Sequence, residues 1–325
     1  MQRLISFDIA KAICIIFVVI GHYLPSGSPM WYMMVNKVIY SFHMPLFMFA
    51  SGYIYMATKK PMPYQGFLLK KMKRLMLPYF SVSLIVITIK LLTEGNAYVE
   101  NPVSGMSYVK MFYLPEAGYF LWFIWALWWM FVLVPLFKTK QSRLALCAVA
   151  LIAHALPICL PEIFCLRQFQ MMLVFFMAGV VCCDWKDHLI WVTKIRSGYF
   201  FLIFAICEIV MLCNTAVPIA PFLPYIGIAA TMALARDIEK WCHDGNEWLM
   251  IVASSSYIIY LFHTAFEGFA KAIIYAIPIF ADTSNMLLFI VNAIFGVTCG
   301  VVCPILLQRY VLNKTKVTRL LFGLK

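Results

Sequence analysis

Long apolar stretches separated by short charged segments form the pattern of this chain. Apolar runs of about 18 residues or more are long enough to cross the hydrocarbon core of a membrane as helices. The charged residues collect between these runs rather than within them. The pattern predicts ten spans, near residues 8–24, 37–56, 75–93, 119–137, 143–160, 168–183, 197–213, 218–235, 249–267 and 285–308.

These spans predict an all-α fold, a polytopic membrane helical bundle of about ten transmembrane helices. The longest connections are segments 57–74 and 94–118, and both are shorter than an independent domain. We therefore expect one integral membrane domain over residues 1–325.

Two prolines and one apolar segment modify this pattern. Pro45 and Pro304 lie inside predicted spans, and each is expected to kink or break its helix because proline has no N–H to donate. Segment 269–281 is apolar but follows the ninth span directly. It is predicted either to lie along the outer interface or to prolong that helix.

Composition and charge support a membrane protein. The 325-residue chain is 64% hydrophobic and 12% charged, with a mean hydropathy of +0.87. A soluble domain is about half apolar and about one quarter charged, so a soluble fold is excluded. The net charge of +12 comes from Lys and Arg on alternate connections, which the positive-inside rule places in the cytoplasm. Both termini are therefore expected to be cytoplasmic, and the basic charge predicts no nucleic-acid partner.

Three polar residues share one face of the first span. Ionisable residues at membrane depth usually face a bundle interior, so they are the first candidates for function. His22 lies eleven positions after Lys11, which is close to three helical turns and about 16 Å along the axis. Asp8 lies one turn before Lys11 and is expected to pair with it. The spacing predicts a cation near the cytoplasmic end and an imidazole deep in the outer half.

The second and ninth spans add histidines at a similar depth. His43 precedes Pro45, which frees a backbone acceptor nearby, and the small Ser51 permits close helix approach or supports the site. His263 lies in the ninth span, and Glu267 follows one turn later, where it is able to orient the imidazole.

Other polar residues receive different interpretations. Glu208 in the seventh span is another carboxylate at membrane depth, expected to support the site. His154 is interpreted as a packing residue that hydrogen-bonds a neighbouring helix. In the inner basic run, Lys73 and Arg74 are candidates to hold a phosphorylated donor. The cysteines form no CxxC pair, and no metal site is predicted.

The residues resemble a known family. The opening with Arg3, Asp8, Lys11 and His22 is similar to that of the acyltransferase 3 family of membrane proteins. The motifs FHMPLFMFASGY, RLMLPY, LWFIWAL and SYIIYLFH follow in the matching order and cover essentially the whole chain. Within the family, IYSFHMPLF is most similar to the fucose O-acetylase-like branch.

The resemblance implies an O-acyltransferase of the bacterial inner membrane. It would transfer an acyl group, usually acetyl from acetyl-CoA, to a hydroxyl of a cell-surface glycan or lipid-linked saccharide. No tightly bound cofactor is expected; acyl-CoA, the saccharide and membrane lipid are the expected partners. Many members carry Arg at the position of Lys11, and lysine lacks the bidentate fork of arginine. The expected roles are catalytic for His22, His43 and Asp8, donor binding for Lys11, Arg3, Lys73 and Arg74, and acceptor binding or support for Ser51, His263, Glu267 and Glu208.

Two other classes of function fit the same polar residues. A polytopic transporter or flippase of a saccharide or lipid would use the polar stripe as a path, although no internal repeat of such proteins is evident. A haem or quinone protein would use His22, His43 and His263 as ligands or contacts. An absorption spectrum of the purified protein separates the haem alternative from the others.

Overall fold

The computed structural model is all-helical over the residues that it describes. These residues are 4–93, 102–156, 159–189, 194–213, 219–242, 246–280 and 285–324, and they contain no strand. The predicted fold class is therefore confirmed. The longer helices are α1 (Ile5–His22), α2 (Met30–Ala57), α3 (Tyr64–Thr93), α5 (Trp122–Leu133), α6 (Lys140–Ala155), α7 (Leu166–Asp184), α8 (Ser197–Cys213), α9 (Leu223–Trp241), α10 (Glu247–Tyr275) and α11 (Met286–Leu307).

Over the described residues, each predicted span overlaps one of these helices, and short 3₁₀ turns extend some of the helices. Among the described residues, six helical segments are long and apolar enough to cross a membrane: Ile5–His22, Tyr64–Thr93, Tyr119–Leu136, Ile163–Asp184, Glu247–Tyr275 and Met286–Leu312. The chain is thus a helical membrane protein, and the count of ten spans stays a prediction.

Two local expectations change, and a third, which had two alternatives, is decided for part of its segment. Helix α3 begins at Tyr64, so the inner basic run lies within this helix rather than before it. Helices α2 and α11 continue through Pro45 and Pro304, so the expectation that these prolines break their helices is wrong, whereas a kink stays a prediction. Of segment 269–281, the part up to Tyr275 prolongs α10.

The helices divide into two compact units, which are described separately. Unit 1 contains residues 1–54 and 185–306, and unit 2 contains residues 55–184 and 307–325. The expectation of a single membrane domain over the whole chain stays a prediction.

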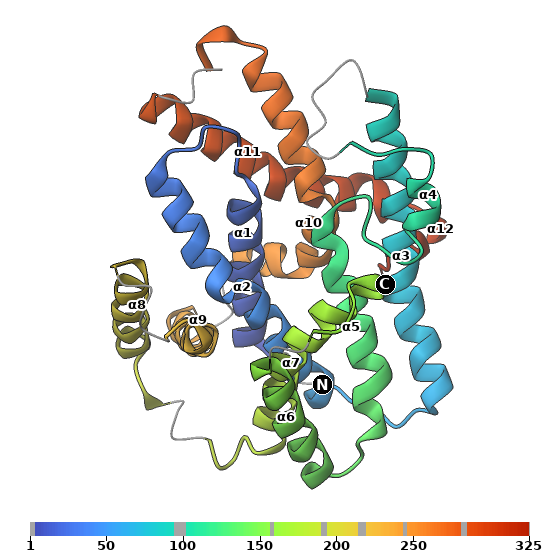
Figure 1. The fold of residues 1–325 in the computed structure, drawn as a ribbon, viewed down its shortest axis with the longest axis vertical. Helices are drawn as coiled ribbons and strands as arrows, with labels where there is room; N and C mark the ends of the chain where they lie inside the picture. Colours follow the sequence, from blue (N-terminus) through green and yellow to red (C-terminus); the bar gives the residue numbers. More distant parts are fainter. Residues whose placement is uncertain are drawn as a thin grey trace. The chain divides into compact units, whose positions relative to one another are not determined.

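Helix α1 is the centre of unit 1. It packs against α9 and α10, and α8 packs against α9. Figure 1 shows α8 beside α9. Its buried side chains occur on several faces of the helix, as expected for a helix surrounded by other helices. Ile9 and Ala10 form a core cluster with Ala235 of α9. Small side chains at this contact allow the two helix backbones to approach.

Two glycines bring α11 against α1. A Cβ atom added to Gly300 would lie 2.7 Å from Cγ1 of Val19, and one added to Gly296 would overlap the ring of Tyr23. A larger side chain at either position would therefore collide with α1. This close packing buries the C-terminal half of α1, which carries His22.

Unit 2 is built around α3, α5, α6 and α7. Helix α7 packs along α6 and α5, and α5 packs along α3; the short α12 (Lys316–Leu321) also contacts α3. Figure 1 shows α6 and α7, both in green, side by side.

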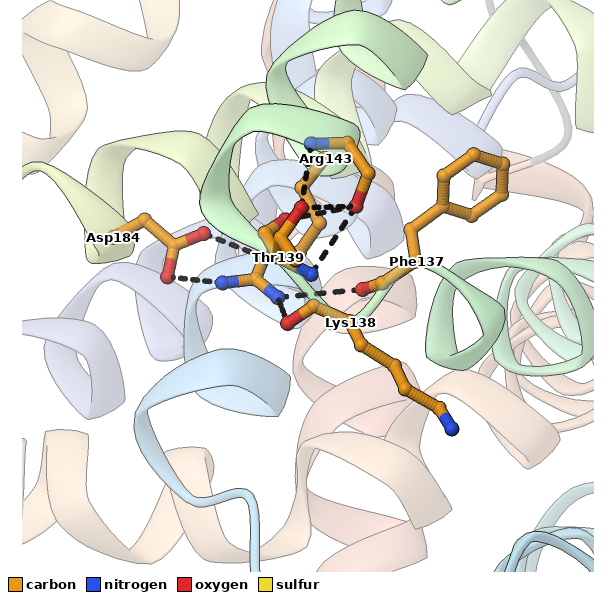
Figure 2. A network of polar contacts seen from close by, with 6 residues as sticks. Phe137, Lys138, Thr139, Arg143 and Asp184 are labelled. Atoms are coloured by element: carbon orange, nitrogen blue, oxygen red, sulfur yellow. Dashed lines mark hydrogen bonds and ion pairs between the residues drawn. The ribbon is translucent and has the colours of Figure 1, made fainter.

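A buried ion pair joins the start of α6 to the end of α7 (Figure 2). The side chains of Arg143 and Asp184 are 5% and 3% exposed. Arg143 donates from Nε and Nη2 to the two carboxylate oxygens, at 2.6 and 2.9 Å, and from Nη1 to the carbonyls of Phe137 and Lys138. Because the charge and the donors of Arg143 are used within unit 2, this arginine is a structural residue rather than a free surface cation.

Candidate active site

The last turn of α1 is held by side chains from α2. The final carbonyls of a helix have no partner within it and need other donors. The hydroxyl of Tyr32 donates to the carbonyl of Ile20 at 2.9 Å, and Nδ2 of Asn36 donates to the carbonyl of Gly21 at 2.5 Å. These two bonds fix the backbone next to His22, which is half-buried. Helix α2 therefore positions the first candidate catalytic residue.

His43 is buried on α2 and fixed in one tautomer. Its Nδ1 lies 2.8 Å from the carbonyl of Ile39, which only accepts hydrogen bonds, so Nδ1 carries the hydrogen. Nε2 of the neutral ring is then an acceptor. The thiol of Cys14 donates to the carbonyl of His43 at 3.0 Å, which ties α1 to α2 at this level.

His263 of α10 is the neighbour of His22. Their ring centroids lie 5.0 Å apart with an interplanar angle of 61°, although the residues come from opposite ends of the chain. His263 is fully buried, and its Nδ1 lies 2.9 Å from the carbonyl of Tyr260 and 3.1 Å from that of Ile259. Nδ1 therefore carries the hydrogen here too, which leaves Nε2 as the acceptor of the neutral ring.

Tyr40 lies near His22 of α1 and His43 of α2. Its ring centroid is 4.8 Å from that of His43 and 6.1 Å from that of His22. We did not identify Tyr40 from the sequence, although its position three residues before His43 places both on one helix face. The three histidines and this tyrosine thus belong to a single aromatic group in unit 1.

Glu267 is buried one turn after His263, where the sequence suggests a supporting carboxylate. Its Oε1 and Cγ would each lie 3.1 Å from a Cβ atom on Gly300, so the side chain packs closely against this glycine. The phenols of Tyr23, Tyr32 and Tyr40 lie within electrostatic range of the carboxyl group. Phenol groups from the end of α1 and from α2 are therefore part of the electrostatic environment of this carboxyl group.

Glu208 of α8 reaches the same part of α2. Its side chain is buried, and Oε1 lies 2.6 Å from the hydroxyl of Ser41. That hydroxyl also lies 2.7 Å from the carbonyl of Val38. Ser41 is two residues before His43, so Glu208 supports the backbone that carries this histidine.

The cation of the first span is paired as predicted. Nζ of Lys11 lies 2.7 Å from Oδ1 of Asp8, and the two side chains are 27% and 19% exposed. The helical rise separates Lys11 from His22 by about 16 Å. Asp8 therefore accompanies Lys11 and lies far from the imidazoles.

The other predicted site residues that the structure describes are Ser51 of α2, and Lys73 and Arg74 of α3. Ser51 is half-buried and lies eight residues after His43, about 12 Å along α2. Lys73 and Arg74 belong to unit 2 and are exposed. Arg3 lies outside the described residues. In the described part of the chain, no three His, Cys, Asp or Glu side chains form a metal-binding group.

Lys71 is the cation of the inner run that turns inward. Its Nζ lies 3.5 Å from the ring centroid of Phe131 and 5.4 Å from that of Phe67, in a cation–π arrangement. The position of Lys71 within a run of cations does not indicate which of their side chains faces the aromatic residues.

His154, interpreted as a packing residue, belongs to unit 2. Its Nδ1 lies 2.9 Å from the carbonyl of Met171 on α7, and its ring lies edge-on to Phe175. This contact with a neighbouring helix is the arrangement predicted for it.

Comparison with known proteins identifies the family. Residues 4–309 match the family described as "Acyltransferase domain", the acyltransferase 3 family. The chain is 32% identical to nodulation protein NolL of Sinorhizobium fredii over 173 residues, which are 51% of this chain and 46% of that protein. It is 47% identical to NolL of Mesorhizobium japonicum over 58 residues, 16% of each chain. The chain thus spans less than half the length of these relatives, and no solved structure matches it. Since the family match covers almost the whole chain, this protein belongs to the acyltransferase 3 family of membrane acyltransferases.

Proposed function

We propose that this protein is a membrane O-acyltransferase of the bacterial inner membrane. It moves an acyl group, acetyl in the simplest case, from cytoplasmic acyl-CoA to a hydroxyl of a cell-surface glycan or lipid-linked saccharide. The observation that carries the proposal is the contact of His22 with His263, beside His43, in a chain of an acyltransferase family. Acyl transfer to a hydroxyl requires a group that removes a proton, and imidazole is the side chain best suited to this near neutral pH.

In the proposed reaction His22 is the base. Its imidazole takes the proton of the acceptor hydroxyl while the oxygen attacks the thioester carbonyl. The C–S bond then breaks, and the imidazolium returns its proton to the leaving thiolate, giving the ester and free CoA. A covalent route also balances: the neutral imidazole of His22 attacks the thioester carbonyl and the CoA thiolate leaves. The acceptor hydroxyl then attacks the acyl-imidazolium and its proton passes to the thiolate, which gives the ester, free CoA and neutral His22.

The fixed tautomers of the other two histidines support distinct roles. The single N–H of neutral His43 is used by the carbonyl of Ile39. His43 is therefore better suited to accept a hydrogen bond from the acceptor hydroxyl at Nε2 than to donate one to an oxyanion. His263 has the same arrangement, with Nδ1 used by its own helix. As an acceptor beside His22, it orients and stabilises the imidazolium that forms during transfer.

The buried carboxyl groups and the cations have supporting roles in this proposal. Glu267 and Glu208 hold the helices that carry His263 and His43. The predicted donor-binding cations are suited to hold the phosphates of acyl-CoA, because phosphate groups bind Lys and Arg through charge-assisted hydrogen bonds. The candidates are Lys11, which is paired with Asp8, and Lys73, Arg74 and Arg3. Acyl-CoA acts as a co-substrate, and no tightly bound cofactor enters the reaction.

Acyl transfer in membranes tests this function directly. Membrane vesicles containing the protein receive acetyl-CoA labelled in the acetyl group, together with lipid-linked saccharide from the same host. We expect label in the saccharide fraction that mild alkali releases as acetate, as esters require. Vesicles without the protein are the control. Saccharide movement across the vesicle membrane without acetyl-CoA, and with no ester formed, would contradict the proposal and favour a transporter.

A further inference from the structure

Unit 2 contains a pocket that the histidine site does not use. It has a volume of about 190 Å³ and is lined by Leu114, Pro115, Glu116, Tyr119, Glu162, Cys165 and Gln168. The helical segments Tyr119–Leu136 and Ile163–Asp184, both long enough to span a membrane, begin here. The pocket therefore lies at the membrane surface, at the end that the charge distribution assigns to the outside.

Cations balance the two carboxylates of the pocket. Oε2 of Glu116 accepts a hydrogen bond from the hydroxyl of Ser107 at 3.2 Å, and Oε1 lies 3.9 Å from Nζ of Lys110. Glu162 lies 3.2 Å from Nη1 of Arg167. Because each carboxylate has a basic neighbour, the pocket has no excess negative charge to attract a metal ion. The carboxylate oxygens remain good acceptors for the hydroxyls of a neutral ligand.

Tyr119 and Gln168 add a donor to these acceptors. Nε2 of Gln168 donates to the phenol oxygen of Tyr119 at 2.7 Å. The hydrogen of the phenol is then left to donate to another group. The pocket thus offers both a donor and acceptors, with the apolar surfaces of Leu114 and Pro115 beside them.

The backbone below the pocket is held in an unusual conformation. Phe164 and Cys165 have φ angles of 55° and 54°, in the left-handed region that non-glycine residues rarely adopt. Two hydrogen bonds hold the strained turn: the N–H of Phe164 donates to the carbonyl of Tyr113 at 2.7 Å, and Nε1 of Trp129 donates to the carbonyl of Phe164 at 3.0 Å. Such strain persists where the surroundings fix it, and it is frequent at binding sites.

We propose that this pocket binds one neutral sugar ring of the acceptor saccharide, an inference that rests on the proposed function. A sugar ring presents hydroxyls that both donate and accept, and apolar C–H faces that pack on Leu114, Pro115 and the ring of Tyr119. The volume is smaller than the roughly 300 Å³ at which pockets for drug-sized ligands begin, so it suits a single ring. In this proposal, unit 2 recognises the acceptor by binding one of its sugar rings.

Binding in the absence of any acyl donor tests the pocket. The full chain, purified in detergent, is titrated with methyl α-D-glucopyranoside, methyl α-D-galactopyranoside and methyl α-D-mannopyranoside, and binding is followed by saturation-transfer NMR. We expect at least one pyranoside to bind, and we expect Glu116→Gln and Tyr119→Phe to raise its Kd by about threefold to tenfold, the effect of one lost hydrogen bond. Tyr199→Phe is the matched control, because Tyr199 and Tyr119 are both 64% exposed.

Three results would overturn this proposal. The first is that no pyranoside binds, and the second is that Tyr199→Phe weakens binding as much as Tyr119→Phe does. The third is that Ca²⁺ rather than any pyranoside binds, with loss of Ca²⁺ binding in Glu116→Gln. Thermal unfolding of each variant in detergent establishes that it is folded. If the pocket does not bind a sugar, the wild-type protein should still transfer acetyl groups. If the proposed function is wrong, the wild-type protein transfers no acetyl group.

Discussion

The imidazole of His22 in the first helix contacts that of His263 in the tenth, with ring centroids 5.0 Å apart. Helices α1 and α10 pack along each other, so this contact belongs to the core of unit 1 rather than to a flexible surface. The Nδ1 atom of His263 is used by carbonyls of its own helix. The pair therefore joins a histidine with a fixed tautomer to one that is half-buried and suited to react.

This pairing predicts that His263 acts through the hydrogen-bond acceptor Nε2 rather than through the packing of its ring. His263→Phe keeps a ring but removes the acceptor, so kcat for acyl transfer should fall about tenfold or more, within the range of general acid–base effects. His263→Gln places an amide oxygen near the position of Nε2 and should recover part of the loss. Steady-state kinetics at saturating acetyl-CoA measures both variants.

His188→Phe is the control for this pair, since His188 is exposed and contacts Trp185. It should leave kcat unchanged. If His263→Gln is as inactive as His263→Phe while both are folded, the hydrogen-bonding role of His263 is wrong.

The sequence predicts the helices and one local side-chain pair well. The apolar runs correspond to the observed helices, and the i, i+3 spacing correctly pairs Asp8 with Lys11. The depths of His22, His43 and His263 follow from their distances to the span ends. These features depend on local spacing, which helix geometry fixes without knowledge of the neighbouring helices.

The contacts between helices could not be predicted, because they depend on which helices are neighbours. The contact of Glu208 with Ser41 requires α8 to meet α2 in one register, and the contact of His22 with His263 requires α1 to meet α10. Arg143 has the same sequence character as a cytoplasmic anchor, yet it is buried against Asp184. Helix packing in membranes depends on small residues and on close contacts, and the apolar pattern alone does not encode the partners.

Gly300 should be required for the packing of unit 1. In Gly300→Ala the added Cβ would lie 2.7 Å from Val19 and 3.1 Å from Glu267, so α11 has to move away from α1 and α10. Overpacking of this kind costs about 1–3 kcal/mol. Thermal unfolding in detergent measures the loss.

Gly268→Ala serves as the matched control, because nothing lies within 4 Å of its added Cβ. Its stability should be unchanged or slightly raised, since alanine favours a helix. Equal unfolding temperatures for the two variants would contradict the close approach of α11 to α1.

The buried ion pair of unit 2 predicts a large structural effect. Arg143→Ala leaves Asp184 buried without its partner, which costs about 3–5 kcal/mol. Arg167→Ala removes an exposed pair with Glu162 and should cost less than about 1 kcal/mol. Comparison of the two unfolding midpoints, and of the yields of folded protein, provides the measurement. An Arg143→Ala variant as stable as Arg167→Ala would show that the pair contributes little.

The predicted donor-binding cations should affect the binding of acetyl-CoA more than the rate of the chemical step. Lys11→Ala and Arg74→Ala are each expected to raise the KM for acetyl-CoA by about twofold to tenfold, with a smaller change in kcat, because phosphate contacts at exposed sites are weakened by solvent. Lys60→Ala, which removes another exposed lysine, is the control. Unchanged KM in both Lys11→Ala and Arg74→Ala would remove the proposed donor-binding role.

The most direct test of the proposed mechanism is acetyl transfer by His22→Ala compared with His154→Ala. Labelled acetyl incorporation into the saccharide is measured in membranes and normalised to the amount of inserted protein. We predict that His22→Ala loses at least about 10²- to 10⁴-fold in rate, as expected for loss of a general base, and more if His22 carries the acyl group. His154→Ala, which loses a backbone contact and a ring contact with α7, should retain activity in proportion to its protein level. Retained activity in His22→Ala, with or without loss in His154→Ala, would contradict the assignment of His22 as the catalytic residue.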